Sequence, residues 1–140
     1  LEPAVGSPAR GPFLQWMHWS EASLMPPLGQ INAHKFVLRE ADRIPAALAL
    51  ARRQFARVVE QLDRALVGVD YLVEGRFTAA DLTFACMGAP YVLPLEYGIR
   101  LPTISELPAD MRPLADEMRA HPAGAFILRL FRDERRRVAG

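Results

Sequence analysis

The sequence predicts an all-helical fold, a bundle of about five helices around a buried central helix. Three observations support this expectation. Apolar residues recur at spacings of three and four, which places them on one face of a helix. A fourteen-residue stretch, 82–95, carries no charge, and Pro, Gly or Asp separates the periodic segments. The one strand-like stretch, 67–73, is isolated, so it is expected to be a loop with apolar anchors, because a lone strand has no partner for its backbone.

The composition is that of one globular domain. The chain has 140 residues, of which 51% are apolar and 24% are charged. We expect a helical domain at 12–134, between a linker or helix lead-in at 1–11 and a basic tail at 135–140. The net charge of +1 predicts no binding of nucleic acid or of a membrane surface. Cys86 is the single cysteine, which excludes an internal disulfide and favours the cytoplasm; its apolar surroundings predict a buried, unreactive thiol.

The first helix is expected over residues 12–38. Its apolar stripe consists of Phe13, Trp16, Met17, Ser20 and Leu24. Pro26 and Pro27 lack the backbone N–H that a helix interior needs, so they are expected to interrupt or kink this helix.

The second helix, over residues 45–67, has the clearest pattern. Its apolar face consists of Leu48, Ala51, Phe55, Val58, Leu62 and Leu66. Glu60 and Arg64 form an i,i+4 pair in the favourable order, and Gly68 ends the helix.

Three further helices complete the expected bundle. The central helix runs from Thr78 to about Tyr97, through an uncharged stretch that is shorter than the roughly 20 residues a membrane-spanning helix needs. A fourth helix covers residues 108–120. Pro122 opens a fifth, whose buried stripe is Phe126, Ile127, Leu130 and Phe131.

A capping motif marks the start of the central helix. Thr78 and Asp81 have the spacing of a capping box, in which each side chain hydrogen-bonds to the other residue's backbone N–H. Phe77 and Leu82 have the spacing of a hydrophobic staple around the same turn. Because the helix is apolar, its first N–H groups lie away from water and need such local partners.

The segment around this cap resembles the C-terminal all-helical domain of the glutathione S-transferases. There, a YL-x-G-x-x-F-T-x-A-D stretch starts the central buried helix. The matching residues here are Tyr71, Leu72, Gly75, Phe77, Thr78, Ala80 and Asp81, with one extra residue before the Gly. The stretches 13–19 and 25–28 resemble the first helix of that domain, and 121–123 resembles the start of its closing helix. The resemblance covers nearly the whole chain.

The resemblance implies a parent enzyme that conjugates glutathione to hydrophobic electrophiles, as in detoxification. It implies a homodimer, and glutathione as the co-substrate, with no cofactor in this chain. The family's N-terminal thioredoxin-like domain, which binds glutathione and activates its thiol, is absent from the sequence, so this chain alone is expected to be inactive. The alternative is a non-catalytic interaction module, because the same helical domain also serves as a scaffold in multi-protein assemblies.

The resemblance also implies a pocket for the electrophile, lined by the first and central helices. His18, Ala22 and Met25 share one helix face at i, i+4 and i+7, and Tyr91 completes the predicted substrate-binding set. Packing in the core or at an interface is the alternative for all four residues. We expect no catalytic residue, and no metal site, since the histidines and carboxylates lack the spacing of known metal motifs.

Overall fold

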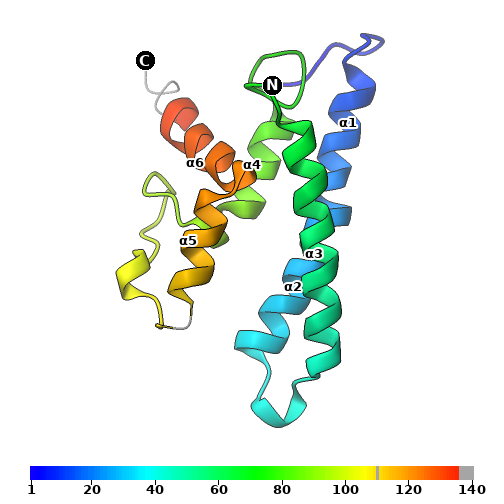
Figure 1. Cartoon of the computed structure of the whole chain (residues 1–140). Helices are drawn as coiled ribbons and strands as arrows, with labels where there is room; N and C mark the ends of the chain where they lie inside the picture. Colours follow the sequence, from blue (N-terminus) through cyan, green and yellow to red (C-terminus); the bar gives the residue numbers. More distant parts are fainter. Residues whose placement is uncertain (110, 136–140) are drawn as a thin grey trace.

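The regular elements of the structure are all helical. The computed structural model describes residues 1–109 and 111–135, and no strand occurs among them (Figure 1). The elements are α1 (Arg10–Trp19), η1 (Ser20–Leu24), α2 (Met25–Asn32), η2 (Ala33–Val37), η3 (Glu40–Asp42), α3 (Pro45–Ala65), α4 (Ala79–Val92), η4 (Ile104–Glu106), α5 (Arg112–Ala120) and α6 (Pro122–Glu134). Since α1 to η2 form one continuous helical segment, the main helical segments number five, which confirms the predicted fold class. Of the predicted basic tail, all but Arg135 lies outside the described residues.

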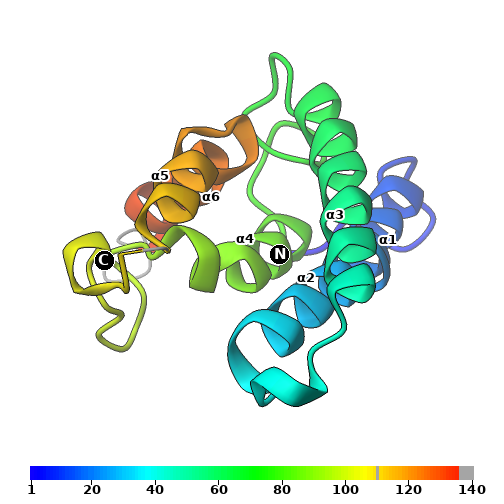
Figure 2. The ribbon, with the colours of Figure 1, turned by 60° about the horizontal axis from the view of Figure 1, so that its bottom comes forward.

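Helix α4 lies at the centre of the bundle, as predicted. Figure 2 shows it between the α5–α6 pair on one side and α1, α2 and α3 on the other. Its buried residues Phe84, Ala85, Ala89 and Val92 belong to the main core cluster, which also includes residues of α2, α3 and α6. One stripe of α4 faces outward, and Cys86 lies on it. The prediction of a buried thiol is therefore wrong, because even an uncharged helix leaves one side uncovered here.

The two prolines of the first helical segment change its hydrogen bonding without breaking it. The π-helical η1 directly precedes Pro26 and Pro27, which occupy the first turn of α2. In a π-helical turn, each N–H donates to the carbonyl five residues back. This altered bonding lets the helical segment continue although the two prolines lack an N–H donor. The fully buried Ser20 hydroxyl donates to the Trp16 carbonyl at 2.9 Å, within the same bend.

Two predicted helix ends are wrong, and proline explains both. The central helix stops at Val92 instead of near Tyr97, because Pro94 disfavours right-handed helical backbone at Leu93. Leu93 ends the helix in the left-handed conformation, at φ 50°. The Arg119 guanidinium then donates to the Val92 carbonyl at 2.9 Å and covers the end of α4. The fourth helix begins at Arg112 instead of at residue 108, because Pro113 is tolerated only in a first turn.

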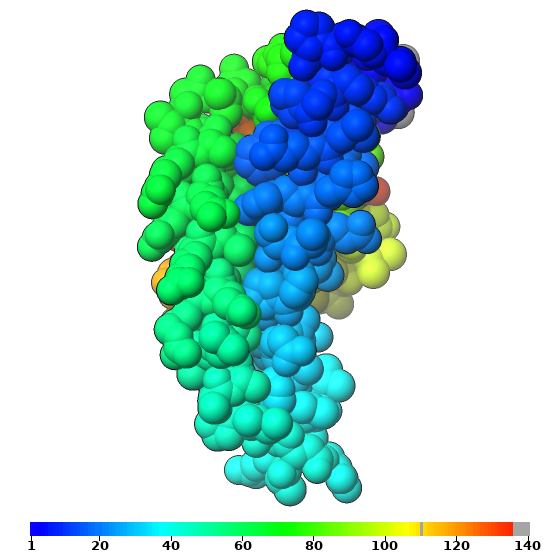
Figure 3. Space-filling view, turned by 90° about the vertical axis from the view of Figure 1, so that its right-hand side faces the viewer, coloured from blue at the N-terminus to red at the C-terminus, as the bar shows by residue number. Residues whose placement is uncertain are grey.

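The 10–37 segment and α3 form a long pair. Figure 3 shows their side chains lying along one another over a face that narrows toward η2 and η3. The Glu60–Arg64 pair is present on the exposed side of α3, with 3.8 Å between the charged atoms. Across the described residues, no helix combines the length and the apolar character that crossing a membrane requires.

Candidate functional site

The start of α4 is held by a buried carboxylate. Asp81 Oδ2 accepts from the Thr78 backbone N–H and from the Thr78 hydroxyl, each at 2.9 Å. The Thr78 hydroxyl oxygen accepts in turn from the Ala80 N–H at 3.3 Å, and both halves of the capping box are present. Thr78 and Asp81 are both 0% exposed. The first donors of the helix are thus paired inside the protein, where water could not replace these partners.

The second oxygen of Asp81 fixes the loop before the helix. Oδ1 accepts from the Leu72 N–H at 2.8 Å. Next to Leu72, the Tyr71 hydroxyl donates to the Glu134 carboxylate of α6 at 2.5 Å, and the Arg129 guanidinium lies over the Tyr71 ring. The 67–77 loop is therefore tied to both α4 and α6.

Phe77 and Leu82 have different surroundings from those a closed staple would give. Phe77 packs edge-on against Tyr71, with 6.3 Å between ring centroids, and contacts the main core cluster. Leu82 is 42% exposed. The staple between Phe77 and Leu82 stays a prediction.

The N-terminal segment crosses the start of α4. The Ala79 N–H donates to the Leu1 carbonyl at 2.7 Å, so residue 1 supplies a partner that the capping box does not. Glu2 and Arg10 form an ion pair at 2.7 Å, and the Arg10 guanidinium lies over the ring of Phe13. This arrangement leaves a space between the N-terminal segment, α1 and α4.

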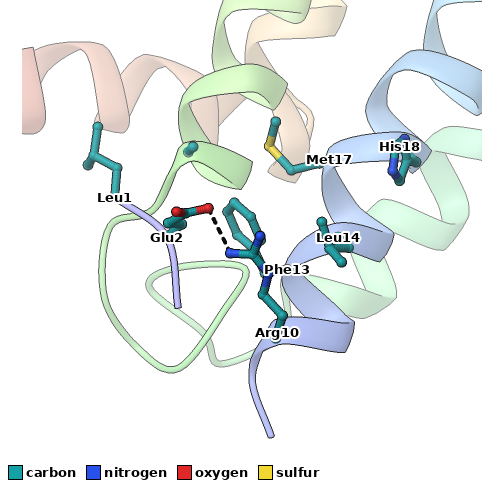
Figure 4. A pocket seen from close by; sticks show the side chains of 8 residues that line it. Leu1, Glu2, Arg10, Phe13, Leu14, Met17 and His18 are labelled. Carbon is teal, nitrogen blue, oxygen red and sulfur yellow. Dashed lines mark hydrogen bonds and ion pairs between the residues drawn. The ribbon is translucent and has the colours of Figure 1, made fainter. Parts of the chain in front are cut away.

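That space is a cavity of about 430 Å³ (Figure 4). Its lining residues are Leu1, Glu2, Arg10, Phe13, Leu14, Met17, His18 and Ala79. Most of the wall is apolar, and the Glu2–Arg10 ion pair and the His18 imidazole supply the polar groups. Met17 also connects α1 to α4, because its sulfur accepts a hydrogen bond from the Thr83 hydroxyl at 3.4 Å. The arrangement suits a largely apolar ligand that carries some polar atoms.

The structure brings only part of the predicted substrate-binding set to this cavity. His18 lines it. Ala22 and Met25 continue the same exposed face beyond α1, in η1 and α2, and Met25 is 38% exposed. Tyr91 lies near the other end of α4, half-buried against the main core cluster, and burial raises the pKa of its phenol. The phenol therefore stays protonated at neutral pH and can donate a hydrogen bond.

Sequence reasoning missed the other lining residues. Leu14 is four positions before His18, so the helical spacing that selected Ala22 and Met25 after His18 would also have selected Leu14 before it. The contribution of Leu1 and Glu2 had no periodic signal, because it depends on how an irregular segment folds back on the helices.

Trp16 and Trp19 pack edge-to-face, with centroids 5.3 Å apart, against the main core cluster.

No group of three or more His, Cys, Asp or Glu side chains is arranged to hold a metal ion within residues 1–109 and 111–135. The chemistry that the cavity offers is apolar contact, one ion pair and one imidazole.

Comparisons with known proteins identify the fold. The sequence matches no model of a known protein family and no curated protein. The structure is similar to glutathione transferases of Phanerochaete chrysosporium. URE2P8 with oxidized glutathione is 23% identical, with a TM-score of 0.57 over 99% of this chain and 58% of that chain. URE2P6 in complex with oxidized glutathione is also 23% identical, with a TM-score of 0.58 over 97% of this chain and 58% of that chain.

A third similar structure is Ure2p5, cocrystallized with 1-(S-glutathionyl)-2,4-dinitrobenzene. It is 19% identical, with a TM-score of 0.58 over 96% of this chain and 61% of that chain. The chain thus spans about three-fifths of the length of these structures. Its fold is that of the C-terminal helical domain of glutathione transferases.

Proposed function

We propose that this chain is the domain of a glutathione transferase that binds the hydrophobic electrophile. The observation that supports this proposal is the similarity of fold over almost the whole chain to glutathione transferases solved with oxidized glutathione or with a glutathionyl-dinitrobenzene conjugate. In the reaction, the glutathione thiolate attacks the electrophilic carbon, forms a C–S bond and expels the leaving group with its electron pair. The part that lowers the pKa of that thiol belongs to a separate thioredoxin-like domain.

The cavity supports the binding role. Phe13, Leu14 and Met17 provide an apolar wall along α1 for an aromatic or alkyl electrophile. Leu14 is 40% exposed in this chain, and burying such a surface against a ligand is favourable. His18 lies at the same wall, where an imidazole can donate to a polar substituent, for example a nitro oxygen. Ala22, Met25 and Tyr91 extend the proposed substrate-binding surface beyond this cavity.

The outward stripe of α4 supports docking of the thioredoxin-like domain. Leu82, Cys86 and Pro90 lie at i, i+4 and i+8, all exposed, and together they form an apolar stripe on the central helix. We assign this stripe as the surface on which that domain docks. We further propose a cytoplasmic homodimer and a role in detoxification.

A conjugation assay tests the proposal. The 140-residue chain, supplied with excess glutathione and 1-chloro-2,4-dinitrobenzene, should give no rate above the uncatalysed reaction. The same chain, extended by the sequence encoded upstream of Leu1 in its gene, should be active. Robust turnover by the chain alone would contradict the assignment of thiol activation to another domain.

The second candidate is a non-catalytic interaction module, and the same exposed stripe of α4 favours it. The extended chain distinguishes the two functions. If that chain folds and binds neither glutathione nor its dinitrophenyl conjugate, the enzyme proposal fails and the interaction module remains.

A further inference from the structure

A second cavity lies at the opposite end of the 10–37 segment from the cavity under the N-terminal segment. It has a volume of about 260 Å³, and its lining residues belong to η2, to the start of α3 and to the segment between them. Figure 1 shows these elements at the tip of the long helical pair. Its lining residues are His34, Lys35, Arg43, Ile44, Pro45, Leu48 and Arg52. None of them lines the first cavity, so this tip cavity is a separate feature.

The tip cavity collects positive charge that the chain as a whole does not have. Between residues 34 and 53 there are five Lys or Arg residues and two acidic ones, whereas the whole chain has a net charge of only +1. One of the two acids, Asp42, is paired with Arg39 at 2.8 Å, outside the cavity lining. Of the carboxylates that the structure describes, none lies within 4.0 Å of a charged atom of Lys35, Arg43 or Arg52. Three cations thus border the cavity without a counter-ion among the described carboxylates.

His34 adds an oriented donor. Its side chain is only 8% exposed, and its Nδ1 accepts from the Ile44 N–H at 3.2 Å. Because a backbone N–H can only donate, Nδ1 carries no proton and the neutral ring carries its proton on Nε2. No hydrogen bond within the described residues uses Nε2, and Nε2 is not among the fully buried atoms that lack a partner. This N–H is therefore not sealed off from solvent, and His34 is one of the residues that line the cavity.

The first turn of α3 also favours an anion. The helix is 21 residues long, has Pro45 in its first turn, and has neither a side-chain cap nor an acidic residue there. The N-terminal end of a helix carries partial positive charge, which an anion stabilises. The N–H groups of Ala47 and Leu48 already donate to the Ile44 carbonyl and Pro45 has none, so the Ala46 N–H is the donor that this turn offers to a ligand. In most helices, the side chain of a Ser, Thr, Asp or Asn at the N-cap accepts a hydrogen bond from one of the first N–H groups. Here the apolar Ile44 occupies the N-cap.

We propose that the tip cavity binds a small anion of the phosphate class. Lys35, Arg43 and Arg52 supply the charge, and the His34 Nε2–H and the Ala46 N–H supply donors. Ile44 and Leu48 form an apolar side of the cavity. A phosphomonoester with a small apolar group therefore fits better than free phosphate.

An NMR titration tests this. Backbone amide shifts of the 140-residue chain are followed on adding inorganic phosphate or phenyl phosphate at fixed ionic strength. Both should produce saturable shifts at Ala46, Ala47 and Leu48, and phenyl phosphate should bind more tightly. Tighter binding of inorganic phosphate would assign the site to free phosphate and overturn the preference for an ester.

Two variants distinguish binding in the tip cavity from nonspecific electrostatic attraction of the anion to the chain. Arg52→Gln should weaken binding about fivefold, since it removes one charge-assisted contact. Arg53→Gln removes the same charge one residue further along α3, outside the cavity lining, and should leave the affinity within about twofold. Equal weakening by both variants, or shifts that never saturate, would overturn the proposal.

Discussion

The carboxylate of Asp81 accepts a hydrogen bond from the backbone N–H of Leu72, with 2.8 Å between Leu72 N and Asp81 Oδ1. Its other oxygen closes the capping box with Thr78. One buried side chain therefore joins the first turn of the central helix to the loop that precedes it. The same loop is attached to α6 through the hydrogen bond from Tyr71 to Glu134. The Asp81 carboxylate therefore links α4 to α6 through this loop.

Asp81→Asn is expected to lower the free energy of unfolding by about 2–3 kcal/mol. Asparagine keeps the shape but has one acceptor oxygen, so a buried N–H of Leu72 or Thr78 loses its partner, and each such loss costs about 1–3 kcal/mol. Urea unfolding followed by circular dichroism measures the change.

A second capping box provides the control for this substitution. Thr103 and Glu106 form the same motif at η4, where hydrogen bonds from Thr103 lower the pKa of the Glu106 carboxyl. This motif is exposed to solvent, so water replaces the lost acceptor in Glu106→Gln, which should leave the unfolding curve nearly unchanged. Equal effects of the two substitutions would contradict the role assigned to burial.

The cap was predictable from sequence because all its bonds span at most three residues. The bond from Leu72 to Asp81 was not, since it depends on a loop returning to the helix with its N–H pointing inward. The same limit applies to Leu1, whose carbonyl accepts from Ala79 across 78 positions of the chain. Helical periodicity located the five segments, and proline chemistry explains the two ends that it placed wrongly.

The candidate site was less predictable than the fold. The spacing that placed His18 beside the cavity also selected Ala22 and Met25, which lie further along the same exposed face. The exposure of Cys86 depends on which side of α4 its neighbours cover, and the apolar sequence of α4 carries no such information.

Gly124→Ala is expected to destabilise the protein by about 1–3 kcal/mol or more. A methyl group at this position of α6 would come to 1.8 Å from the Met118 carbonyl oxygen, which is backbone and cannot rotate away. The close contact between α5 and α6 therefore requires glycine. Thermal unfolding measures the loss.

Gly29→Ala is the matched comparison within α2. A methyl group there meets nothing within 4 Å, so alanine should stabilise the helix by about 0.5–1 kcal/mol. If Gly124→Ala were as harmless as Gly29→Ala, the packing of α5 against α6 would differ from the one described.

The thiol of Cys86 is expected to react slowly with iodoacetamide at neutral pH, although it is exposed. Partial burial raises the pKa of this thiol, and the positive charge of Arg135 offsets part of that rise. Because the thiolate is the reactive form, the alkylation rate should increase with pH, with a midpoint above that of an ordinary cysteine. Mass spectrometry of the alkylated chain over a pH series measures this midpoint.

Arg135→Gln should raise that midpoint further, since it removes the charge that stabilises the thiolate. Arg132→Gln, one turn earlier on α6, is the control, because Asp133 pairs with Arg132 and its charge does not enter the thiol's environment. A midpoint that falls on Arg135→Gln would show that Arg135 does not act on this thiol through its charge.

Leu14→Asp should weaken the binding of 1,3-dinitrobenzene, an unreactive analogue of the proposed electrophile, by about tenfold. Leu14 lines the cavity under the N-terminal segment, so the new carboxylate would lose water without gaining a partner when the ligand enters. Gln15→Asp introduces the same charge on the next residue of α1, which is exposed and outside the cavity lining, and binding should stay within about twofold.

Saturable quenching of tryptophan fluorescence reports the affinity, because Trp16 directly precedes the lining residue Met17. Both variants should unfold at the same temperature as the unmodified chain, since both positions are exposed. A ligand that binds the Leu14→Asp and Gln15→Asp chains equally well must occupy another surface, and the cavity would then lose its proposed role.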